Sequence, residues 1–397
     1  MKKKIFFVIL ILIVAGFIIR SINAAKKSSM IDLNVNIKAA GNLLNSKELY
    51  FFQPYNGGYT YLPAVSIFYI PLKYLSDNFS QNTAKFCWTI FNIIIALMSL
   101  LIIYKTGCFE NKSAISILLF IALFLFFQPL HHNIKYGNIK IILLFGYLLL
   151  FNFKNNSSAA GIILGILVVL SIQPLILIPY FIIKKKYKII LVSAITISSV
   201  IILSLLIVPV SEYILYFSKV IPQLQFEGSS SAPYIQSIDA MCKRLFLEYN
   251  EYTIEIYNSY FLALKLPIIL KVGFLSITLY FIYKSRHIDD KNYFQFSIMF
   301  LCMILIHSIN WEYHYTIILA VITFFYKKVD FISAVLSFKI KCQSVFILFF
   351  ILCLLIGLYY PYDHKFFLSG IPIFFTNTKL FSLIGIYFIL LKKIDFE

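Results

Sequence analysis

Charged side chains are scarce in this 397-residue sequence, and only 17 of them are acidic. Charged residues make up 13% of the chain, whereas a soluble domain carries about 25%. A soluble enzyme and a disordered chain are both excluded, because 60% of the residues are hydrophobic. The six cysteines include no C-x-x-C pair, so neither a disulfide nor a zinc site is expected.

Long apolar runs dominate the sequence instead, and the mean hydropathy is +0.86. A membrane-spanning helix needs roughly 20 residues, so the chain has room for about ten to twelve spans and little else. We predict an all-α fold, a polytopic membrane helix bundle that forms a single integral membrane domain over residues 1–397. The clear runs are Phe86–Tyr104, Ala114–Leu130, Ile141–Phe153, Ala159–Ile183, Ile189–Pro209, Tyr260–Tyr283, Tyr293–Ile309, Tyr315–Tyr326, Val345–Tyr359 and Leu380–Leu391.

The N-terminal run has two interpretations. Lys2-Lys3-Lys4 followed by the apolar stretch Ile5–Ile19 has the outline of a secretory signal peptide. We favour an uncleaved first span, because Arg20 interrupts the end of the run and the rest of the chain is itself a membrane bundle.

Basic residues outnumber acidic ones by 35 to 17 and give a net charge of +18. Because they do not alternate with aromatic residues on a polar surface, they indicate membrane orientation and anionic lipid, not nucleic acid. The positive-inside rule places the basic clusters and both termini in the cytoplasm. These clusters are Lys2-Lys3-Lys4, Lys184-Lys185-Lys186, Lys284 to Lys291, Lys327-Lys328 with Lys339 and Lys341, and Lys392-Lys393. We expect surface helices and a catalytic loop, at about 25–60, among the segments that this rule leaves outside. These segments are Lys26–Thr60, Ser211–Glu255, Ser308–His314 and Tyr360–Lys379.

The stretch 61–183 permits two arrangements. In one, Tyr61–Leu75 crosses the membrane and Ala159–Ile183 is a single helix. In the other, Tyr61–Leu75 lies along the outer surface and Ala159–Ile183 is a re-entrant pair, broken at Pro174. We favour the second, which places the loop His131–Asn138 outside, because a broken helix at membrane depth is tolerated where it lines a cavity.

Ionisable residues that survive among apolar ones mark functional sites in membrane proteins, and the first such segment is Met30–Tyr61. Asp32 stands near its start, just after the first span. It is a candidate catalytic carboxylate, or it simply favours a helix N-terminus through the helix dipole. Apolar residues that recur every four positions predict an amphipathic helix on the bilayer surface, and they are Ile31, Val35, Ala39 and Leu43.

The second segment lies between two apolar runs and holds His131, His132, Lys135 and Asn138. Paired histidines suggest a metal, but adjacent side chains point apart on a helix and no carboxylate is near, so no metal is expected. We interpret the segment as a site that recognises phosphate or sugar, with a plain interfacial loop as the alternative.

Two later segments supply the remaining candidates. Gln236 and Arg244 lie in the longest polar stretch, where an arginine either holds a phosphate bidentately or snorkels to lipid phosphate. Trp311, Glu312 and His314 follow in HSINWEYHY. That cluster is denser in polar groups than an interfacial aromatic belt requires, so it is a candidate binding site.

The order of these segments resembles the polytopic GT-C glycosyltransferases, and most closely glycosyltransferase family 87, over about residues 5–330. The sequence departs from the family pattern where Asn138 replaces a glutamine, Lys140 an asparagine and Ser171 a lysine. The resemblance is carried by Asp32 with Ala39-Ala40, by Tyr61-Leu62-Pro63-Ala64, by Gly137 to Lys140, by Gly161 to Gly165 running to Pro174, by Gln236-Ser237 with Arg244, and by Ser308 to His314.

This resemblance implies a GT-C-like membrane hexosyltransferase that moves a sugar, such as mannose, from a polyprenyl-phosphate donor to a lipid or glycan acceptor. It implies a site at the outer face of the cell membrane, Asp32 as the base, inversion at the anomeric carbon, and no metal or cofactor. Arg244, Lys135 and the histidine pair are then the candidates for the donor phosphate. On the same resemblance, we expect Lys135 or Lys140 to supply the charge missing at Ser171, Trp311 to stack on a sugar or the prenyl chain, and Glu312 and His314 to bind hydroxyl groups.

Two other classes share parts of this pattern. A lipid-linked polysaccharide polymerase or ligase would also use arginines and histidines at the outer face, but the early aspartate and its amphipathic helix argue against it. A transporter or lipid flippase would place charged residues deep in its spans and open a cavity to both sides, whereas the polar residues here gather on one face.

Overall fold

The computed structural model describes residues 2–50, 58–226, 231–247, 255–289, 292–329, 332, 344–358, 360 and 371–396. Over these ranges the secondary structure is helical, as predicted, and the single β-type contact is an isolated antiparallel bridge between Ile235 and Trp311. The predicted basic residues Lys291, Lys339 and Lys341 lie outside the described residues.

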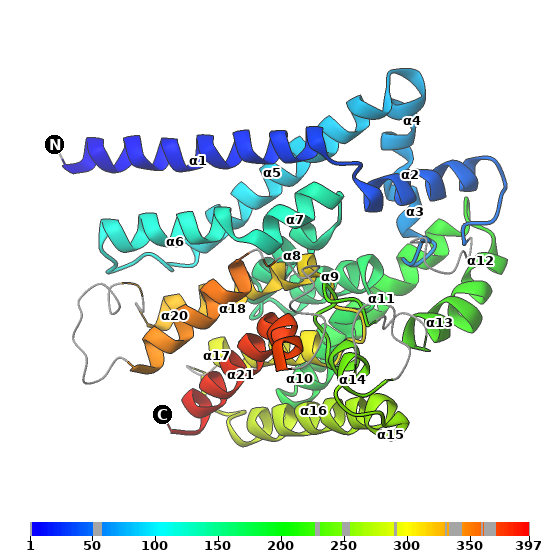
Figure 1. Cartoon of the computed structure of the whole chain (residues 1–397). Helices are drawn as coiled ribbons and strands as arrows, with labels where there is room; N and C mark the ends of the chain where they lie inside the picture. The colour runs from blue at the N-terminus through cyan, green and yellow to red at the C-terminus, as the bar shows by residue number, and fades with distance from the viewer. Residues whose placement is uncertain are drawn as a thin grey trace. The chain divides into compact units, whose positions relative to one another are not determined.

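The α-helices are labelled in Figure 1, and η in the text denotes a 3₁₀ or π helix. In chain order they are α1 (Lys2–Lys27), α2 (Ile31–Leu44), α3 (Val65–Phe68), α4 (Ile70–Asn78), α5 (Gln81–Lys105), α6 (Ala114–Phe126), α7 (Gln128–Tyr136), α8 (Lys140–Asn152), α9 (Ser157–Leu170), η1 (Gln173–Ile176), α10 (Leu177–Ile183), α11 (Tyr187–Ser204), α12 (Val210–Leu215), η2 (Tyr216–Val220), α13 (Ile221–Phe226), α14 (Ile238–Phe246), α15 (Tyr260–Leu264), α16 (Leu266–Lys284), α17 (Asn292–Leu305), η4 (Glu312–Ile317), α18 (Ile318–Lys328), α20 (Ser344–Gly357), η7 (Ile371–Asn377) and α21 (Thr378–Phe396).

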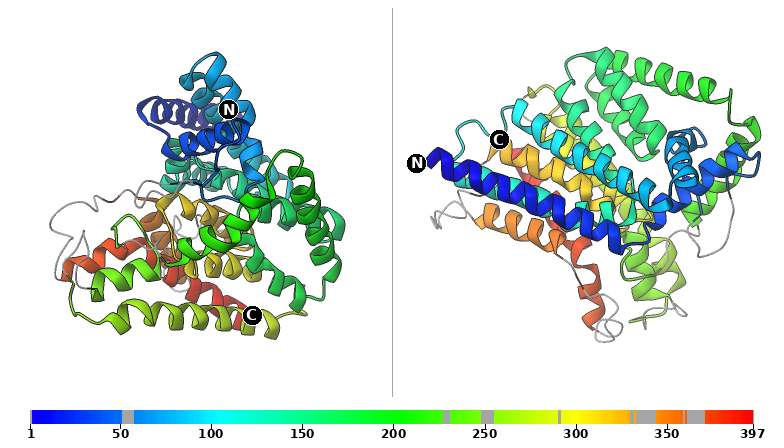
Figure 2. Two further views of the ribbon diagram at one scale, coloured as in Figure 1. Left: turned by 90° about the vertical axis from the view of Figure 1, so that its right-hand side faces the viewer. Right: turned by 90° about the horizontal axis from the view of Figure 1, so that it is seen from above.

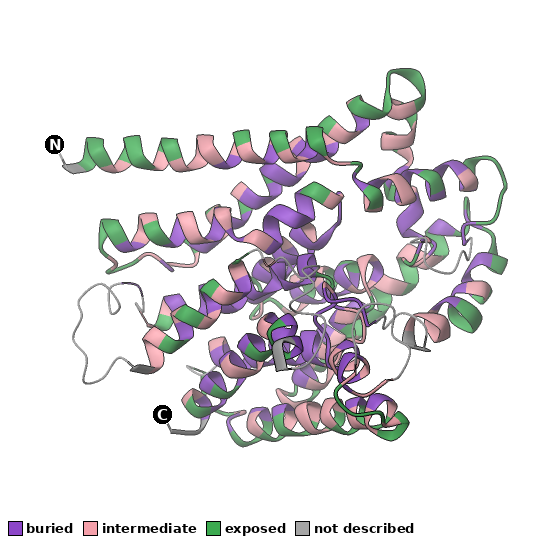
Figure 3. Cartoon of the chain, in the orientation of Figure 1, coloured by how far each residue is buried: buried purple, intermediate pink, exposed green. Residues whose placement is uncertain are grey.

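Six helical segments in the described part of the chain are long and apolar enough to cross a membrane, so the chain is a multi-pass membrane protein. Large apolar side chains on α1 are exposed, including Ile11 at 64% and Leu12 at 65%, and Figure 3 shows this exposure along the helix. At least four of the five shorter apolar helices must also cross if the number of spans is to reach the predicted ten to twelve. The six segments are Lys3–Lys27, Gln81–Lys105, Ala114–Tyr136, Tyr187–Ser204, Tyr260–Lys284 and Ile373–Ile394.

The helices pack into two compact units. Unit 1 comprises residues 1–106 and 130–224, and unit 2 comprises residues 107–129 and 225–397. In unit 1, α1 packs along α5, α5 packs against α8, and α8 packs against α9 (Figures 1 and 2). In unit 2, α17 packs against α16, α18 and α21, and α20 packs against α21. The single membrane domain inferred from the sequence stays a prediction.

The apolar run that contains α9 is broken, as the second arrangement predicted, and the break includes the 3₁₀ turn η1 with Pro174. α9 and α11 pack closely and run parallel. A Cβ atom on Gly161 would lie 2.6 Å from the Cβ of Val192, and one on Gly165 would lie 2.6 Å from the Cβ of Thr196. Because two consecutive parallel helices need a return between them, η1 and α10 must run back along α9. The chain therefore forms a broken hairpin here.

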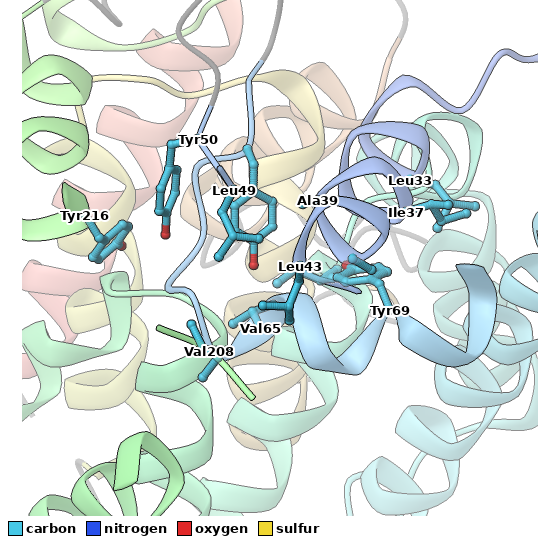
Figure 4. Close-up of a cluster of buried hydrophobic side chains, with 14 of the residues drawn as sticks. Leu33, Ile37, Ala39, Leu43, Leu49, Tyr50, Val65, Tyr69, Val208 and Tyr216 are labelled. Atoms are coloured by element: carbon cyan, nitrogen blue, oxygen red, sulfur yellow. The ribbon is translucent and has the colours of Figure 1, made fainter. Parts of the chain in front are cut away.

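The amphipathic helix predicted after the first span is α2, but the predicted apolar face was partly wrong. Ile31 is 53% exposed, whereas Leu33 is completely buried. The buried face of α2 is the one that packs against α3 and α4. That face does not coincide with the four-residue repeat of apolar residues in the sequence. Figure 4 shows Leu43 of α2 beside Val65 of α3 in this hydrophobic cluster, which also contains Tyr69. The packing fixes the first turn of α2, where Asp32 lies.

Candidate active site

Asp32 and Asn138 meet in unit 1, although 106 positions separate them. Asp32 lies in the first turn of α2 and is half-buried, and Asn138 lies in the turn between α7 and α8. The side-chain amide of Asn138 donates a hydrogen bond of 2.7 Å to Oδ2 of Asp32. Its own oxygen accepts a bond of 2.7 Å from the N–H of Ile139. The carboxylate is thus held by an amide that is itself fixed, and a positioned carboxylate can accept a proton from a hydroxyl group.

Gly137 allows the two segments to approach. Its φ of +73° lies in the left-handed region, which residues with a Cβ rarely adopt. A Cβ at this position would also lie 2.6 Å from the Cβ of Leu33 on α2. From the other side, Nε1 of Trp88 on α5 donates a bond of 3.0 Å to the Gly137 carbonyl. The turn that carries Asn138 is therefore held between α2 and α5.

The connection between α1 and α2 is also tied to α7. Met30 adopts a φ of 50° at the entry to α2, so the chain turns sharply there. The hydroxyl of Ser28 accepts a bond of 3.1 Å from the Met30 N–H and donates one of 2.5 Å to the carbonyl of Lys135. These bonds set the direction in which α2 starts, and with it the position of Asp32.

Two more polar side chains surround the Asp32 carboxylate. Burial first, and then Asp32, raise the pKa of the Tyr61 hydroxyl, and the Asn138 side chain opposes this in part, so the hydroxyl stays protonated at neutral pH. Lys140 is attracted electrostatically by Asp32, and its Nζ donates a bond of 3.1 Å to Oε1 of Gln173. The site therefore combines a carboxylate, an amide, a hydroxyl and an ammonium group.

The segment that precedes Asn138 was expected to be a loop, and that expectation was wrong. Gln128–Tyr136 forms the helix α7. Pro129 stands in its first turn, where a missing N–H costs nothing, and no glycine interrupts the segment before Gly137. Only the turn after Gly137 is irregular, and that turn carries Asn138.

The other candidates of this segment lie along α7. His131 and His132 are 8% and 6% exposed, and Nδ1 of His131 has no hydrogen-bond partner among the described residues. Arg20 of α1 is close enough to His131 to interact with it electrostatically. Lys135 is exposed, with its Nζ 5.4 Å from the centroid of the Tyr136 ring. Across the described part of the chain, no group of three His, Cys, Asp or Glu side chains is arranged to hold a metal ion.

In unit 2 the structure brings Gln236 and Trp311, two predicted site residues, into adjoining backbone segments. The Gln236 N–H donates a bond of 2.8 Å to the carbonyl of Asn310, and Ile235 forms the β-bridge with Trp311. The hydroxyl of Tyr315 donates a bond of 2.6 Å to the Gln236 carbonyl. The two later segments of the sequence prediction therefore form one region.

Trp311 is the exposed part of a stack of aromatic rings. Its ring lies 4.9 Å from that of Tyr234 at an interplanar angle of 18°, and 6.3 Å from that of Tyr313 at 2°. Trp311 is 36% exposed, whereas Tyr313 is buried. Such a flat, partly exposed aromatic surface suits stacking against the apolar face of a sugar ring.

Glu312 and His314 flank this stack and are largely buried. The carboxylate of Glu312 forms an ion pair with Nζ of Lys379, whose side chain is fully buried. Nδ1 of His314 accepts a bond of 3.2 Å from the Trp311 N–H, and the ring lies 5.5 Å from that of His307. The other ring nitrogen of His314, Nε2, does not take part in this backbone bond.

Arg244 is fully buried and holds the loop that precedes α14. Its NH1 group donates bonds of 2.8 Å to the carbonyl of Ala232 and 3.0 Å to that of Ile235, and its NH2 group donates to Oδ1 of Asn377. These bonds give Arg244 a structural role. A contact of the same guanidinium with the donor phosphate stays a prediction.

Residues 59–308, more than half of the chain, match the sequence model of glycosyltransferase family 87. The chain belongs to glycosyltransferase family 87. The resemblance inferred from the sequence is thereby confirmed, and this family 87 protein is a membrane glycosyltransferase. No curated protein matches the chain. The stretch that matches family 87 includes the α7–α8 turn and Arg244, while Asp32 precedes it and the Trp311 cluster follows it.

Three residues that shape these regions of the family 87 protein were not singled out from the sequence. Trp88 holds the turn of Asn138, Gln173 binds Lys140, and Lys379 pairs with Glu312. Each of these residues is a polar group within or beside an apolar run of the sequence. A polar group in the membrane costs free energy, so such residues are usually functional. That signal marks such residues but does not name their partners.

Proposed function

We propose that this family 87 protein transfers a hexose, such as mannose, from a polyprenyl-phosphate donor to a hydroxyl group of a lipid or glycan acceptor. The observation that carries the proposal is the half-buried carboxylate of Asp32, held at 2.7 Å by Asn138 and attracted to the buried Lys140. A positioned base beside a cation is what glycosyl transfer from a phosphate donor requires.

The reaction is a displacement at the anomeric carbon. Asp32 takes the proton of the acceptor hydroxyl, and the oxygen forms a bond to the anomeric carbon as the bond to the donor phosphate breaks. The electron pair of that bond leaves with the phosphate, and the configuration inverts. Phosphate is a good leaving group, so no general acid, metal or cofactor is needed. General base catalysis contributes roughly 10²–10⁴-fold to such a step.

The membrane setting supports a lipid-linked donor. Exposed apolar side chains on α1 and α5 offer a surface to acyl and prenyl chains, and α1 leads directly to the turn before Asp32. By the positive-inside rule the basic clusters and both termini are cytoplasmic, and the site faces the outer side of the plasma membrane.

The region around Trp311 supplies further substrate contacts. The Trp311 ring stacks on a sugar or on the prenyl chain, while Glu312, His314 and Gln236 bind hydroxyl groups. The partial exposure of the Trp311 ring and its stack with Tyr234 support this assignment. The histidines of α7 and Lys135 are proposed to contact the donor phosphate.

The test is a transfer assay with purified protein in nanodiscs, radiolabelled polyprenyl-phosphate sugars, and membrane lipids and glycans as acceptors. Wild type should transfer label, and Asp32→Asn should lower turnover by about two orders of magnitude or more. Asp77→Asn removes an exposed carboxylate on α4 and should behave as wild type. Transfer by Asp32→Asn at the wild-type rate would remove Asp32 from the role of base.

A further inference from the structure

Lys140 is buried and has no ion-pair partner in the described part of the chain. It is the first residue of α8 and is only 4% exposed. Its Nζ donates one hydrogen bond, of 3.1 Å, to the neutral side chain of Gln173. Among the described residues no carboxylate lies within ion-pair distance of it, and the nearest acidic influence is the attraction from Asp32.

Two other lysines among the described residues form contact ion pairs. Lys379 is fully buried and forms an ion pair with Glu312. Lys271, which is partly buried, pairs with Asp239 at 2.6 Å. An ammonium group has three donors, and leaving a charge buried without a counter-ion costs several kcal/mol. Lys140 therefore has spare donors, and its ammonium form has no counter-ion at contact distance among the described residues, at a position where an unpaired charge is costly.

The surroundings of Lys140 are suited to an anion. Its Nζ reaches Gln173 at the break between α9 and α10, and Gln173 is partly exposed, so this polar contact lies near the surface. Non-helical backbone at membrane depth is tolerated where it is buried in protein or lines a water-filled cavity. The N-terminus of the 13-residue helix α8 adds its positive dipole end at the same place.

We propose that Lys140 binds the phosphate of the glycosyl donor beside the base Asp32. This inference rests on the proposed function and assigns the cation of the same site. As the sugar–phosphate bond breaks, the phosphate changes from a diester with one negative charge to a monoester that carries up to two. The acceptor proton goes to Asp32, the electron pair goes to the phosphate oxygen, and Lys140 stabilises the charge that develops there. The phosphate would thus give the buried ammonium form of Lys140 the contact counter-ion that the described residues do not supply.

The experiment measures binding of polyprenyl phosphate, the product of the donor, to full-length protein in nanodiscs. Lys140→Gln should weaken this binding by about tenfold or more, which corresponds to roughly 1.4 kcal/mol. Binding of neutral polyprenol should not change, because only the phosphate contact is lost. Lys140→Arg keeps the charge and should restore part of the affinity. Lys38→Gln, at an exposed position on α2, is the matched control and should bind as wild type.

A second variant guards against a folding defect. Gln173→Glu places a carboxylate at the hydrogen-bond partner of Lys140, so it should preserve or raise thermal stability. It should nevertheless weaken polyprenyl phosphate binding, because the new carboxylate competes for the ammonium. Unchanged polyprenyl phosphate binding in both Lys140→Gln and Gln173→Glu would overturn the proposal.

Competition identifies the source of the phosphate. Polyprenyl phosphate should compete at the Lys140-dependent site, whereas inorganic phosphate and nucleoside diphosphates should not. A Lys140-dependent site that prefers either of these soluble ligands would overturn the assignment to the lipid donor. If wild type transfers sugar and Lys140→Gln transfers equally well, the Lys140 proposal fails while the proposed function stands. If polyprenyl phosphate binding depends on Lys140 but no donor supports transfer, the proposed function fails while the phosphate site stands.

Discussion

Asn138 holds the carboxylate of Asp32 from a turn whose left-handed conformation Gly137 favours. The 2.7 Å bond joins the first turn of α2 to the entrance of α8. The position of neither residue is fixed by its own segment of chain alone. The position of the proposed base therefore depends on the packing of α2, α5 and the α7–α8 turn.

We expect Asn138→Ala to lower kcat by about tenfold while the donor KM stays nearly constant, because a base displaced by about 1 Å loses catalytic efficiency without losing substrate contacts. Asn138→Gln keeps the amide and should retain more activity than Asn138→Ala. Steady-state kinetics of the purified variants check both expectations. A raised donor KM at unchanged kcat would instead make Asn138 a substrate-binding residue.

Gly137→Ala should destabilise the fold. The left-handed conformation costs a residue with a Cβ about 1–2 kcal/mol, and the new Cβ would meet the side chain of Leu33 at 2.6 Å. The expected result is a lower melting temperature in detergent, together with lower turnover, since Asn138 moves with the turn.

Gly273 of α16 provides the matched control for this glycine. Nothing lies within 4 Å of a Cβ built there, and alanine is the better helix former by about 1 kcal/mol. Gly273→Ala should therefore leave the melting temperature unchanged or raise it slightly. A Gly137→Ala protein as stable as Gly273→Ala would contradict the strained turn.

The all-helical fold and most helix positions could be predicted from the sequence, because membrane helices consist of long runs of apolar residues. α9 even ended shortly before Pro174, where the break was predicted. The buried face of α2 could not be predicted in the same way. Its burial follows from contacts with α3, α4 and the Gly137 turn, and no period within α2 encodes those partners.

The candidate site divides along the same line. Asp32 and Asn138 were recognisable as polar residues beside apolar runs, but their hydrogen bond depends on an arrangement of three helices. Arg244 was recognisable as a cation, while its burial against the backbone carbonyls of Ala232 and Ile235 was not. A sequence shows which side chains need a polar partner, and only the packing shows which partner they find.

Glu212 on α12 should make stability depend on pH. It is 8% exposed, and Oε2 has no hydrogen-bond partner among the described residues. Burial raises the pKa of this carboxyl group above its usual range; a backbone bond from Leu49 partly opposes the effect, and Glu48 adds to it. The folded protein therefore binds the proton more tightly than the unfolded chain. The contribution of Glu212 to the free energy of unfolding is greatest below the ordinary carboxyl pKa, and it falls as the pH rises through the raised pKa of the folded protein.

Glu212→Gln mimics the protonated side chain and should raise the melting temperature at neutral pH by about 1–3 °C. The difference from wild type should shrink as the pH is lowered toward the ordinary carboxyl range. Melting curves in detergent over a series of buffers measure it, with Asp77→Asn as an exposed control. A difference that grows on acidification would reverse the sign assigned here.

The buried ion pair of Glu312 and Lys379 should stabilise the fold only when both charges are present. Glu312 should in addition be required for activity. Glu312→Gln leaves the fully buried ammonium of Lys379 without its partner and should cost roughly 3–5 kcal/mol. The double variant Glu312→Gln/Lys379→Met removes both charges and should recover most of the melting temperature, because no unpaired charge remains. Its transfer activity should stay low if Glu312 also binds a substrate hydroxyl. Full recovery of both stability and turnover in the double variant would reduce Glu312 to the counter-ion of Lys379.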